Sequence, residues 1–203
     1  MDLKLILSGL TKSYPGRPVF AGINAEVAAG NRLVITGPNG SGKSTMIKII
    51  CGFIRPTRGS ATLAVDGCEL SRLDIRPHIG LVSPDLVLYD ELTALENLNF
   101  FSEVAGIRFE RSELSSRLTA VGLEGRGDDL VGSYSSGMKQ RLKYCLALLR
   151  EPPLLLLDEP SANLDEKGKE LVEGIIDFHK GISVIATNES SELRYGDQIV
   201  RLG

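Results

Sequence analysis

The sequence predicts an α/β protein with a three-layer α/β core, to which a small antiparallel β lobe and a helical lobe are attached. Short apolar segments typical of buried strands alternate with helical patterns, the first 85 residues are rich in strand and turn patterns, and residues 86–150 have helical spacing. We interpret residues 1–203 as a single domain, because a chain of 203 residues can bury one sizeable core. Residues 1–85 would form the β lobe interleaved with the core, 86–150 the helical lobe, and 151–203 the second half of the core.

The composition is that of an ordinary globular protein. The net charge is −3, so no overall positive field suggests nucleic acid as a partner. No apolar run approaches the roughly 20 residues that cross a bilayer, and the N-terminus lacks the basic and apolar regions of an export signal. The three cysteines, Cys51, Cys68 and Cys145, form no metal-binding pattern, and we interpret them as reduced packing residues of a cytosolic protein.

Residues 1–85 predict five strands and one helix. The strands are expected at residues 3–8, 19–27, 31–36, 61–65 and 79–83, with turns at Tyr14–Pro18 and Asp66–Gly67. The helix should follow Lys43 and end near Gly52, because glycine is typical after a helix and Pro56 prevents continuation.

Three helices are predicted within residues 86–150. Thr93 and Glu96 form a capping box, which opens a helix with one apolar face at Leu95, Leu98, Phe101 and Val104. A second helix is expected over residues 112–121, followed by a flexible, polar connection from Gly122 to Gly132. The third helix follows Ser135-Ser136-Gly137 and stops before Pro152. Its apolar positions recur at helical spacing at Met138, Leu142, Cys145, Leu146 and Leu149.

The last third begins with four consecutive leucines, at residues 154–157. So uniform a run favours a parallel strand buried on both faces. Asp165 should begin a helix that ends at Gly181, and strands are expected at residues 182–187 and 198–202. The inward face of that helix is expected to carry Leu171, Val172, Ile175 and Ile176.

The strongest motif follows the strand at residues 31–36 and fits G-x-x-x-x-G-K-[ST] at every fixed position. Its members are Gly37, Pro38, Asn39, Gly40, Ser41, Gly42, Lys43, Ser44 and Thr45. A glycine-rich turn that leads into a helix directs backbone N–H groups and the positive end of the helix dipole at one point. Lys43 would contact the β- and γ-phosphates of a nucleotide, and the Ser44 hydroxyl would bind Mg²⁺. The alternative is an ordinary glycine-rich loop.

A second motif is the acidic pair Asp158-Glu159 at the end of the leucine strand. The carboxyl edge of a parallel sheet is where ligands bind in open α/β folds. Asp158 is suited to hold Mg²⁺ opposite Ser44, and Glu159 could orient or deprotonate the water that attacks the γ-phosphorus. The alternative is a pair of solvated carboxylates.

The third motif is Tyr134-Ser135-Ser136-Gly137-Met138, followed by Lys-Gln-Arg. The three motifs in this order resemble those of an ATP-binding-cassette (ABC) ATPase. The signature of that family, Leu-Ser-Gly-Gly-Gln, appears here as Tyr-Ser-Ser-Gly-Met. The resemblance implies a P-loop NTPase core, with Tyr14 stacked on adenine and residues 161–165 touching the opposite subunit. It also implies that two subunits face head to tail, so that Ser135, Ser136, Gly137 and Met138 of each contact the ATP held by the other. The helix that these residues begin can bind an anion without a basic side chain.

Two positions depart from the family pattern. A glutamine that contacts the metal and relays motion to the membrane partner is replaced by Pro84, for which Asp85 or water could substitute. The histidine after the strand at residues 182–187 is replaced by Asn188, which can hydrogen-bond a γ-phosphate but carries no charge. His78 and His179 are not assigned a catalytic role. With Lys43, Glu159 and Asn188 as catalytic residues, we expect slow but real hydrolysis.

The sequence thus favours an ATPase subunit of an ABC membrane transporter, with ATP and Mg²⁺ as cofactors. The resemblance extends to exporter-type ATPases, including haem-exporter subunits. It implies a homodimer or a related second ATPase subunit, a separate integral membrane permease, and a cytoplasmic location on the inner face of the membrane. The permease should dock near Pro84 to Tyr89, where the run from Leu86 to Tyr89 supplies either apolar surface or core.

Three alternatives are open. A soluble ABC ATPase acting on nucleic acid or ribosomes is disfavoured by the negative charge and the single cassette. A hydrolysis-impaired regulatory subunit would follow if the changes at Pro84 and Asn188 abolish turnover. A small-molecule kinase or GTPase is disfavoured by Tyr14 and by the signature residues.

Overall fold

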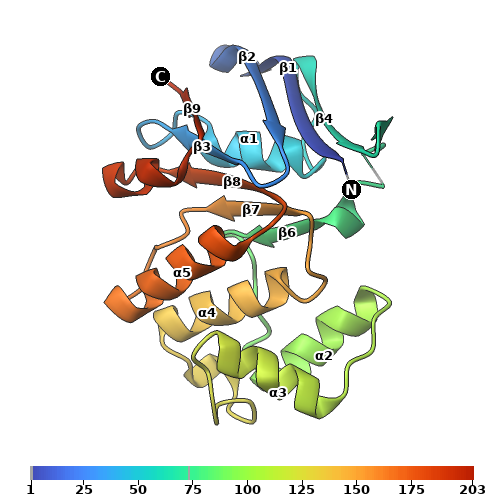
Figure 1. Cartoon of the computed structure of the whole chain (residues 1–203). Coiled ribbons are helices and arrows are strands. Elements are labelled where there is room, and N and C mark those ends of the chain that lie inside the picture. Colours follow the sequence, from blue (N-terminus) through green and yellow to red (C-terminus); the bar gives the residue numbers. More distant parts are fainter. Residues whose placement is uncertain (1, 73) are drawn as a thin grey trace.

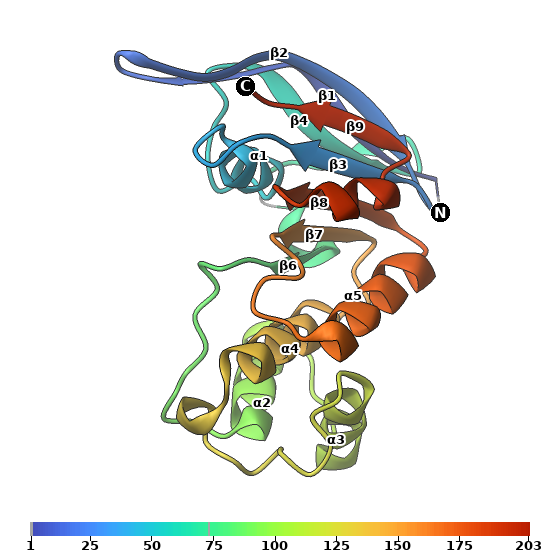
Figure 2. The ribbon, with the colours of Figure 1, turned by 90° about the vertical axis from the view of Figure 1, so that its left-hand side faces the viewer.

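The computed structural model of the protein describes residues 2–72 and 74–203. An antiparallel sheet, a parallel sheet and a group of helices follow one another from top to bottom in Figure 1. The turned view shows α1 (Lys43–Ile50) between the two sheets, while α4 (Ser136–Ala147) and α5 (Glu166–Phe178) cover the other face of the parallel sheet (Figure 2). Two apolar clusters result, one on each face of the parallel sheet. The predicted α/β core with a β lobe and a helical lobe is therefore confirmed.

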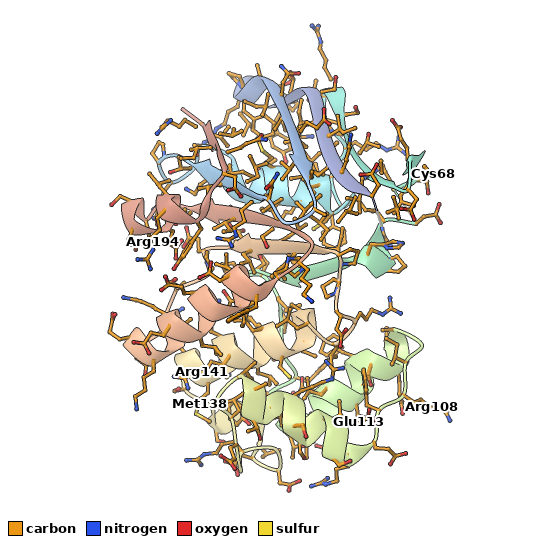
Figure 3. All side chains as sticks on the ribbon, viewed as in Figure 1. Cys68, Arg108, Glu113, Met138, Arg141 and Arg194 are labelled. Atoms are coloured by element: carbon orange, nitrogen blue, oxygen red, sulfur yellow. The ribbon has the colours of Figure 1, made fainter. Side chains whose placement is uncertain are left out.

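The antiparallel sheet has the strand order β2-β1-β4-β5. Its strands are β1 (Leu3–Tyr14), β2 (Arg17–Ala28), β4 (Arg58–Val65) and β5 (Cys68–Glu69). The first strand is longer than the predicted residues 3–8, because it continues through irregular pairings after Leu7 to the tight turn at Pro15-Gly16. The short strand β5 was not predicted. It exposes Cys68 (Figure 3), so the expectation that this cysteine is a packing residue is wrong. Cys51 and Cys145 are buried.

The parallel sheet has the order β6-β7-β8-β3-β9. Its strands are β3 (Arg32–Thr36), β6 (Ile79–Val82), β7 (Leu154–Asp158), β8 (Ile182–Thr187) and β9 (Gln198–Arg201). Every residue of β7 and β8 is buried, which confirms the interpretation of the leucine run as an interior strand. Since the strands are parallel, the segments that follow β3, β6, β7 and β8 meet at one edge of the sheet.

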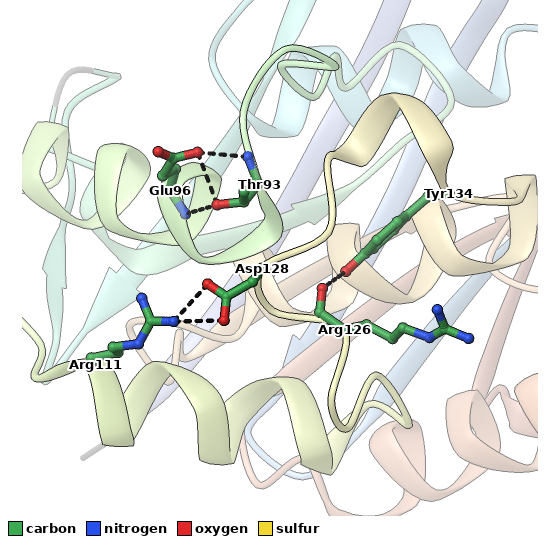
Figure 4. Close-up of polar contacts among 6 residues, drawn as sticks. All are labelled: Thr93, Glu96, Arg111, Arg126, Asp128 and Tyr134. Atoms are coloured by element: carbon green, nitrogen blue, oxygen red, sulfur yellow. Dashed lines mark hydrogen bonds and ion pairs between the residues drawn. The ribbon is translucent and has the colours of Figure 1, made fainter.

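The helical region contains α2 (Ala94–Val104) and α3 (Arg111–Ala120) next to α4. The predicted capping box is present, since the Thr93 N–H donates to Glu96 Oε2 at 2.8 Å and the Glu96 N–H to Thr93 Oγ1 at 3.2 Å (Figure 4). Placing Val104 on the apolar face was wrong, because its side chain is 72% exposed. The predicted apolar face used a spacing of three residues, which is shorter than the helical repeat of 3.6 residues per turn. Val104, nine residues after Leu95, therefore lies on the opposite side of the helix.

The connection from Gly122 to Gly132 is tied to its surroundings. Arg111 holds both carboxylate oxygens of Asp128 at 2.6 and 2.7 Å, and the Tyr134 hydroxyl donates to the Arg126 carbonyl at 2.6 Å (Figure 4). The segment also buries Leu123, and the short 3₁₀ turn Val131–Ser133 buries Val131. The connection that was expected to be polar therefore also contributes two apolar side chains to the core.

The remaining segments complete the edges of the core. Two further 3₁₀ turns, Arg76–His78 and Ser190–Tyr195, precede β6 and β9 respectively. In the run from Leu86 to Tyr89, Val87 and Tyr89 are exposed while Leu88 is buried, so the run is partly surface and partly core. Across the described residues no helix combines the length and apolar character needed to span a bilayer.

Candidate nucleotide-binding site

The loop from Gly37 to Ser44, here called the phosphate loop, joins β3 to α1. Gly40 and Gly42 have φ angles of 82° and 105°, a region that favours glycine. A side chain at Gly42 would also collide with Val19 and Phe20 of β2. Lys43 is 5% exposed, and its Nζ donates to the carbonyls of Gly37 at 2.8 Å and Pro38 at 3.3 Å. Its ammonium group is therefore held against the loop.

A pocket of about 410 Å³ opens beside this loop. It is lined by Tyr14, Arg17, Val19, Asn39, Gly40, Gly42, Lys43, Ser44, Thr45 and Glu159. Tyr14 lies at the tip of the β1–β2 hairpin and is 46% exposed, with the Lys12 ammonium 4.6 Å from its ring centre. The structure thus places the predicted aromatic residue, the lysine and Glu159 around one pocket.

Asp158 ends β7 next to the start of α1. It is 3% exposed, and its Oδ1 has no hydrogen-bond partner among the described residues. Burial raises the pKa of this carboxyl, although a hydrogen bond with Ser44 lowers it, and the negative charge of Glu159 raises it further. A buried carboxylate oxygen without a partner, beside a serine hydroxyl, is the donor set that a hard cation prefers.

Glu159 has a φ angle of 51°, and its N–H donates to the Ala186 carbonyl at 2.8 Å. Its side chain lines both the pocket beside Lys43 and a neighbouring pocket of about 390 Å³ that Asn188 also lines. Asn188 follows β8, and its Nδ2 donates to Asn39 Oδ1 at 3.3 Å. The structure therefore brings both residues to the edge of the phosphate loop.

The segment Ser135–Met138, here called the signature segment, begins α4. Ser135 caps the helix, because its Oγ accepts from the Met138 N–H at 3.2 Å, and Ser135 and Ser136 are exposed. None of these residues lines the pocket beside Lys43. Figure 3 shows Met138 in the helical region, away from the sheets. Within one chain the structure does not bring the signature segment to the phosphate loop.

α4 contacts the segment after Glu159, which the sequence did not predict. The Pro160 carbonyl accepts from Gln140 Nε2 at 3.3 Å and from the Tyr144 hydroxyl at 2.9 Å, and Arg141 pairs with Asp165 at 2.8 Å. Gly137 approaches the Asn163 carbonyl so closely that a Cβ would lie 3.1 Å from it. No spacing within the sequence indicates these contacts, because about 20 residues separate the partners.

The loop at Pro84, one of the two departures from the family pattern, lies beside Lys48. Pro84 is exposed, and Asp85 pairs with Lys48 at 2.6 Å, which lowers the pKa of the Asp85 carboxyl. His179, one of the two histidines in the chain, has a structural role. Its two ring nitrogens contact Ser183 Oγ and the Pro152 carbonyl, and burial lowers its pKa.

The arrangement of the parallel sheet, the phosphate loop and the carboxylates at the next strand end defines a nucleoside-triphosphate-binding protein of the phosphate-loop class. Comparison with known proteins narrows this class. The family described as ABC transporter matches residues 20–162. The chain therefore belongs to the ABC transporter family, and it is an ATP-binding ATPase subunit.

Similar proteins and structures agree with this assignment. The chain is 36% identical over 176 residues to the lantibiotic transport ATP-binding protein SrtF of Streptococcus pyogenes, covering 87% of this chain and 75% of the relative. It is 32% identical to the linearmycin resistance ATP-binding protein LnrL of Bacillus subtilis, covering 90% and 60%. A dimeric bacterial ABC transporter cassette, MJ0796, superposes with a TM-score of 0.83 at 28% identity, covering 98% and 94%. The same cassette has also been solved as a dimer in a post-hydrolysis state with ADP and Pi.

Proposed function

We propose that two subunits, each with a phosphate loop and a signature segment, enclose ATP between them head to tail and that hydrolysis separates them. The observation that carries this proposal is the separation, within one chain, of the exposed signature segment from the pocket beside Lys43. An exposed helix N-terminus without a ligand in its own chain is suited to bind the phosphates of a facing subunit. The cassette solved as a dimer supports this arrangement.

In this proposal each residue has a defined role. Residues 37–45 surround the phosphates and bind them through the backbone N–H groups of the residues other than Pro38. Lys43 neutralises the β- and γ-oxygens, and Tyr14 stacks on adenine. Glu159 orients and deprotonates the attacking water, while Asn188 donates a hydrogen bond to the γ-phosphate. Ser135, Ser136, Gly137 and Met138 contact the γ-phosphate of the ATP on the partner subunit.

Ser44 and Asp158 are the residues that would hold Mg²⁺. The unpartnered Oδ1 of Asp158 fits this assignment, because a buried carboxylate oxygen without a donor is costly until a cation or donor pairs with it. No group of three metal-binding side chains occurs within residues 2–72 and 74–203, so phosphate oxygens and water would complete the coordination. When bound, the ion neutralises charge that develops on the phosphates.

The membrane partner is a separate permease that docks on an aromatic patch beside residues 84–89. The rings of Tyr89, Phe100 and Phe101 pack against one another with centres 5.1 to 5.9 Å apart, and Phe100 meets each of the other two edge to face. Neighbouring Val87 is 76% exposed. Exposed aromatic residues beside a polar rim are typical of protein interfaces. Relatives named for lantibiotic transport and linearmycin resistance support a transporter role at the cytoplasmic face of a membrane. An exporter of the haem type stays a prediction.

A cross-linking experiment tests the head-to-tail arrangement. Asn39→Cys and Ser135→Cys place one thiol on the phosphate loop and one on the signature segment. The same chain carries Cys68→Ser, which removes the exposed native thiol, and Glu159→Gln, which blocks hydrolysis. Mild oxidation should give a cross-linked dimer only when ATP and Mg²⁺ are present. A matched variant with Glu113→Cys in place of Ser135→Cys puts the thiol on α3 and should not cross-link. Cross-linking that is absent, or equal with and without ATP, would contradict the proposal.

Steady-state ATPase measurement separates turnover from the hydrolysis-impaired alternative. Activity that requires both Mg²⁺ and Glu159 supports the proposed roles. The structure adds no observation that favours nucleic acid or ribosomes as partners.

A further inference from the structure

Residues 83–85 lie between two lysines that come from different helices. Lys48 on α1 pairs with Asp85 Oδ2 at 2.6 Å. Lys143 on α4 donates from its Nζ to the carbonyls of Ser83 at 3.0 Å and Pro84 at 3.2 Å. Because α1 begins at the phosphate loop and α4 begins at the signature segment, this three-residue loop is a direct link between the two helices.

The surroundings of Lys143 indicate a specific link. Burial lowers the pKa of this lysine, and the negative charge of Asp85 only partly offsets that effect. Removing an ammonium group from water is costly unless hydrogen bonds compensate. A lysine that only covered apolar surface would place its charged end in solvent. Lys143 instead places it on two carbonyls, so the side chain holds the loop.

Further observations relate this link to the reacting groups. Lys48 lies four residues after Ser44 and so shares a face of α1 with it. The hydrogen bond to Asp85 is the main cause that raises the pKa of Lys48, and the negative charge of Asp158 raises it a little further. On α4, Gln140 and Tyr144 hold the Pro160 carbonyl, next to Glu159. One helix thus holds both the loop after β6 and the loop after β7.

We propose that Lys143 and Lys48 are positioning residues that hold residues 83–85 between α1 and α4, and thereby set the signature segment relative to the phosphate loop. Proline at position 84 has no side-chain donor or acceptor, so the link is made from outside the loop. The inference rests on the proposed function, because the position of the signature segment matters to ATP only when two subunits close on it.

The test uses Lys143→Met, which keeps the length of the side chain and removes its donors. In a Glu159→Gln background, ATP affinity of the monomer should stay within about twofold, because the phosphate loop is unchanged. The ATP-dependent dimer should weaken roughly tenfold or more, as expected for lost charged hydrogen bonds. In the chain with Glu159 intact, kcat should fall by a similar factor with KM nearly unchanged. Lys143→Arg should restore both properties.

Lys139→Met is the matched control on the same helix, because Lys139 pairs with Asp90 and does not contact residues 83–85. Combining Lys48→Met with Lys143→Met should reduce dimerisation and kcat no further than the more damaging of the two single substitutions does. Each substitution breaks the same link between α1 and α4, so their effects should not add. Parental dimerisation and kcat in Lys143→Met would overturn the inference. So would an equal loss in Lys143→Arg together with a lowered melting temperature, which would indicate a role in folding only. Failure of the Glu159→Gln parent to dimerise would contradict the proposed function as well, whereas a dimerising parent with an unaffected Lys143→Met would contradict the inference alone.

Discussion

Asn188 Nδ2 donates a hydrogen bond to Asn39 Oδ1 across 3.3 Å, which joins the end of β8 to the phosphate loop. A neutral amide is thus held where the family resemblance places a histidine. Because both side chains are exposed, a bound nucleotide could compete for the Asn188 donor without breaking a buried contact. The position is therefore suited to contact the γ-phosphate.

Replacing Asn188 by histidine should leave ATPase activity equal or raise it, by up to roughly tenfold, because an imidazole can both donate a hydrogen bond and carry positive charge. Steady-state kcat at saturating ATP is the measurement. Asn99→His, on the exposed side of α2, serves as a control that should not change activity. A large fall in kcat for Asn188→His would show that the amide has a role of its own.

Replacing Lys43 by alanine should weaken ATP binding by about 100-fold or more, since a buried, charged donor to the phosphates is removed. Titration with a fluorescent ATP analogue measures the affinity. Lys4→Ala is the matched control, because Lys4 lies in the antiparallel sheet, where it pairs with Glu26. An unchanged ATP affinity in Lys43→Ala would contradict the assignment of residues 37–44 as the phosphate-binding loop.

Asp158→Asn should abolish Mg²⁺-dependent turnover and yet stabilise the nucleotide-free protein at neutral pH, by about 1 kcal/mol. Burial raises the pKa of the Asp158 carboxyl, so the folded chain pays for ionising it. This cost is present above the raised pKa, shrinks as pH falls through it, and vanishes below the ordinary value of about 3.9.

Thermal unfolding of Asp158→Asn and the parent, measured across this pH range without nucleotide, checks the sign. The stabilisation should be largest at neutral pH and disappear in acid. A variant that is less stable than the parent at neutral pH would show that the carboxylate has a compensating partner.

The sequence was sufficient for the features that depend on local patterns. The phosphate loop, the capping box at Thr93 and the helix start at Ser135 each depend on residues within a few positions of one another, and the structure has all three. Family resemblance added Tyr14 and Asn188, which the structure places beside the loop.

The contacts that link these features could not be predicted, because they join distant segments. Lys143 is 60 residues from Ser83, and Tyr144 is 16 residues from Pro160. Neither pair has a periodic pattern, and both follow from the position of α4 against the ends of β6 and β7. The short edge strand that exposes Cys68 is a different case: it pairs with β4 across the predicted turn at Asp66-Gly67, but its two residues are too few to show a strand pattern.

The oligomeric state of Glu159→Gln tests the central claim most directly. The substitution keeps the shape of the side chain and removes its basicity, so ATP should bind but not turn over. Sedimentation velocity at saturating ATP and Mg²⁺ should show a dimer, and the same protein without nucleotide should be monomeric. A monomer under both conditions would contradict the account, as would hydrolysis at the parental rate.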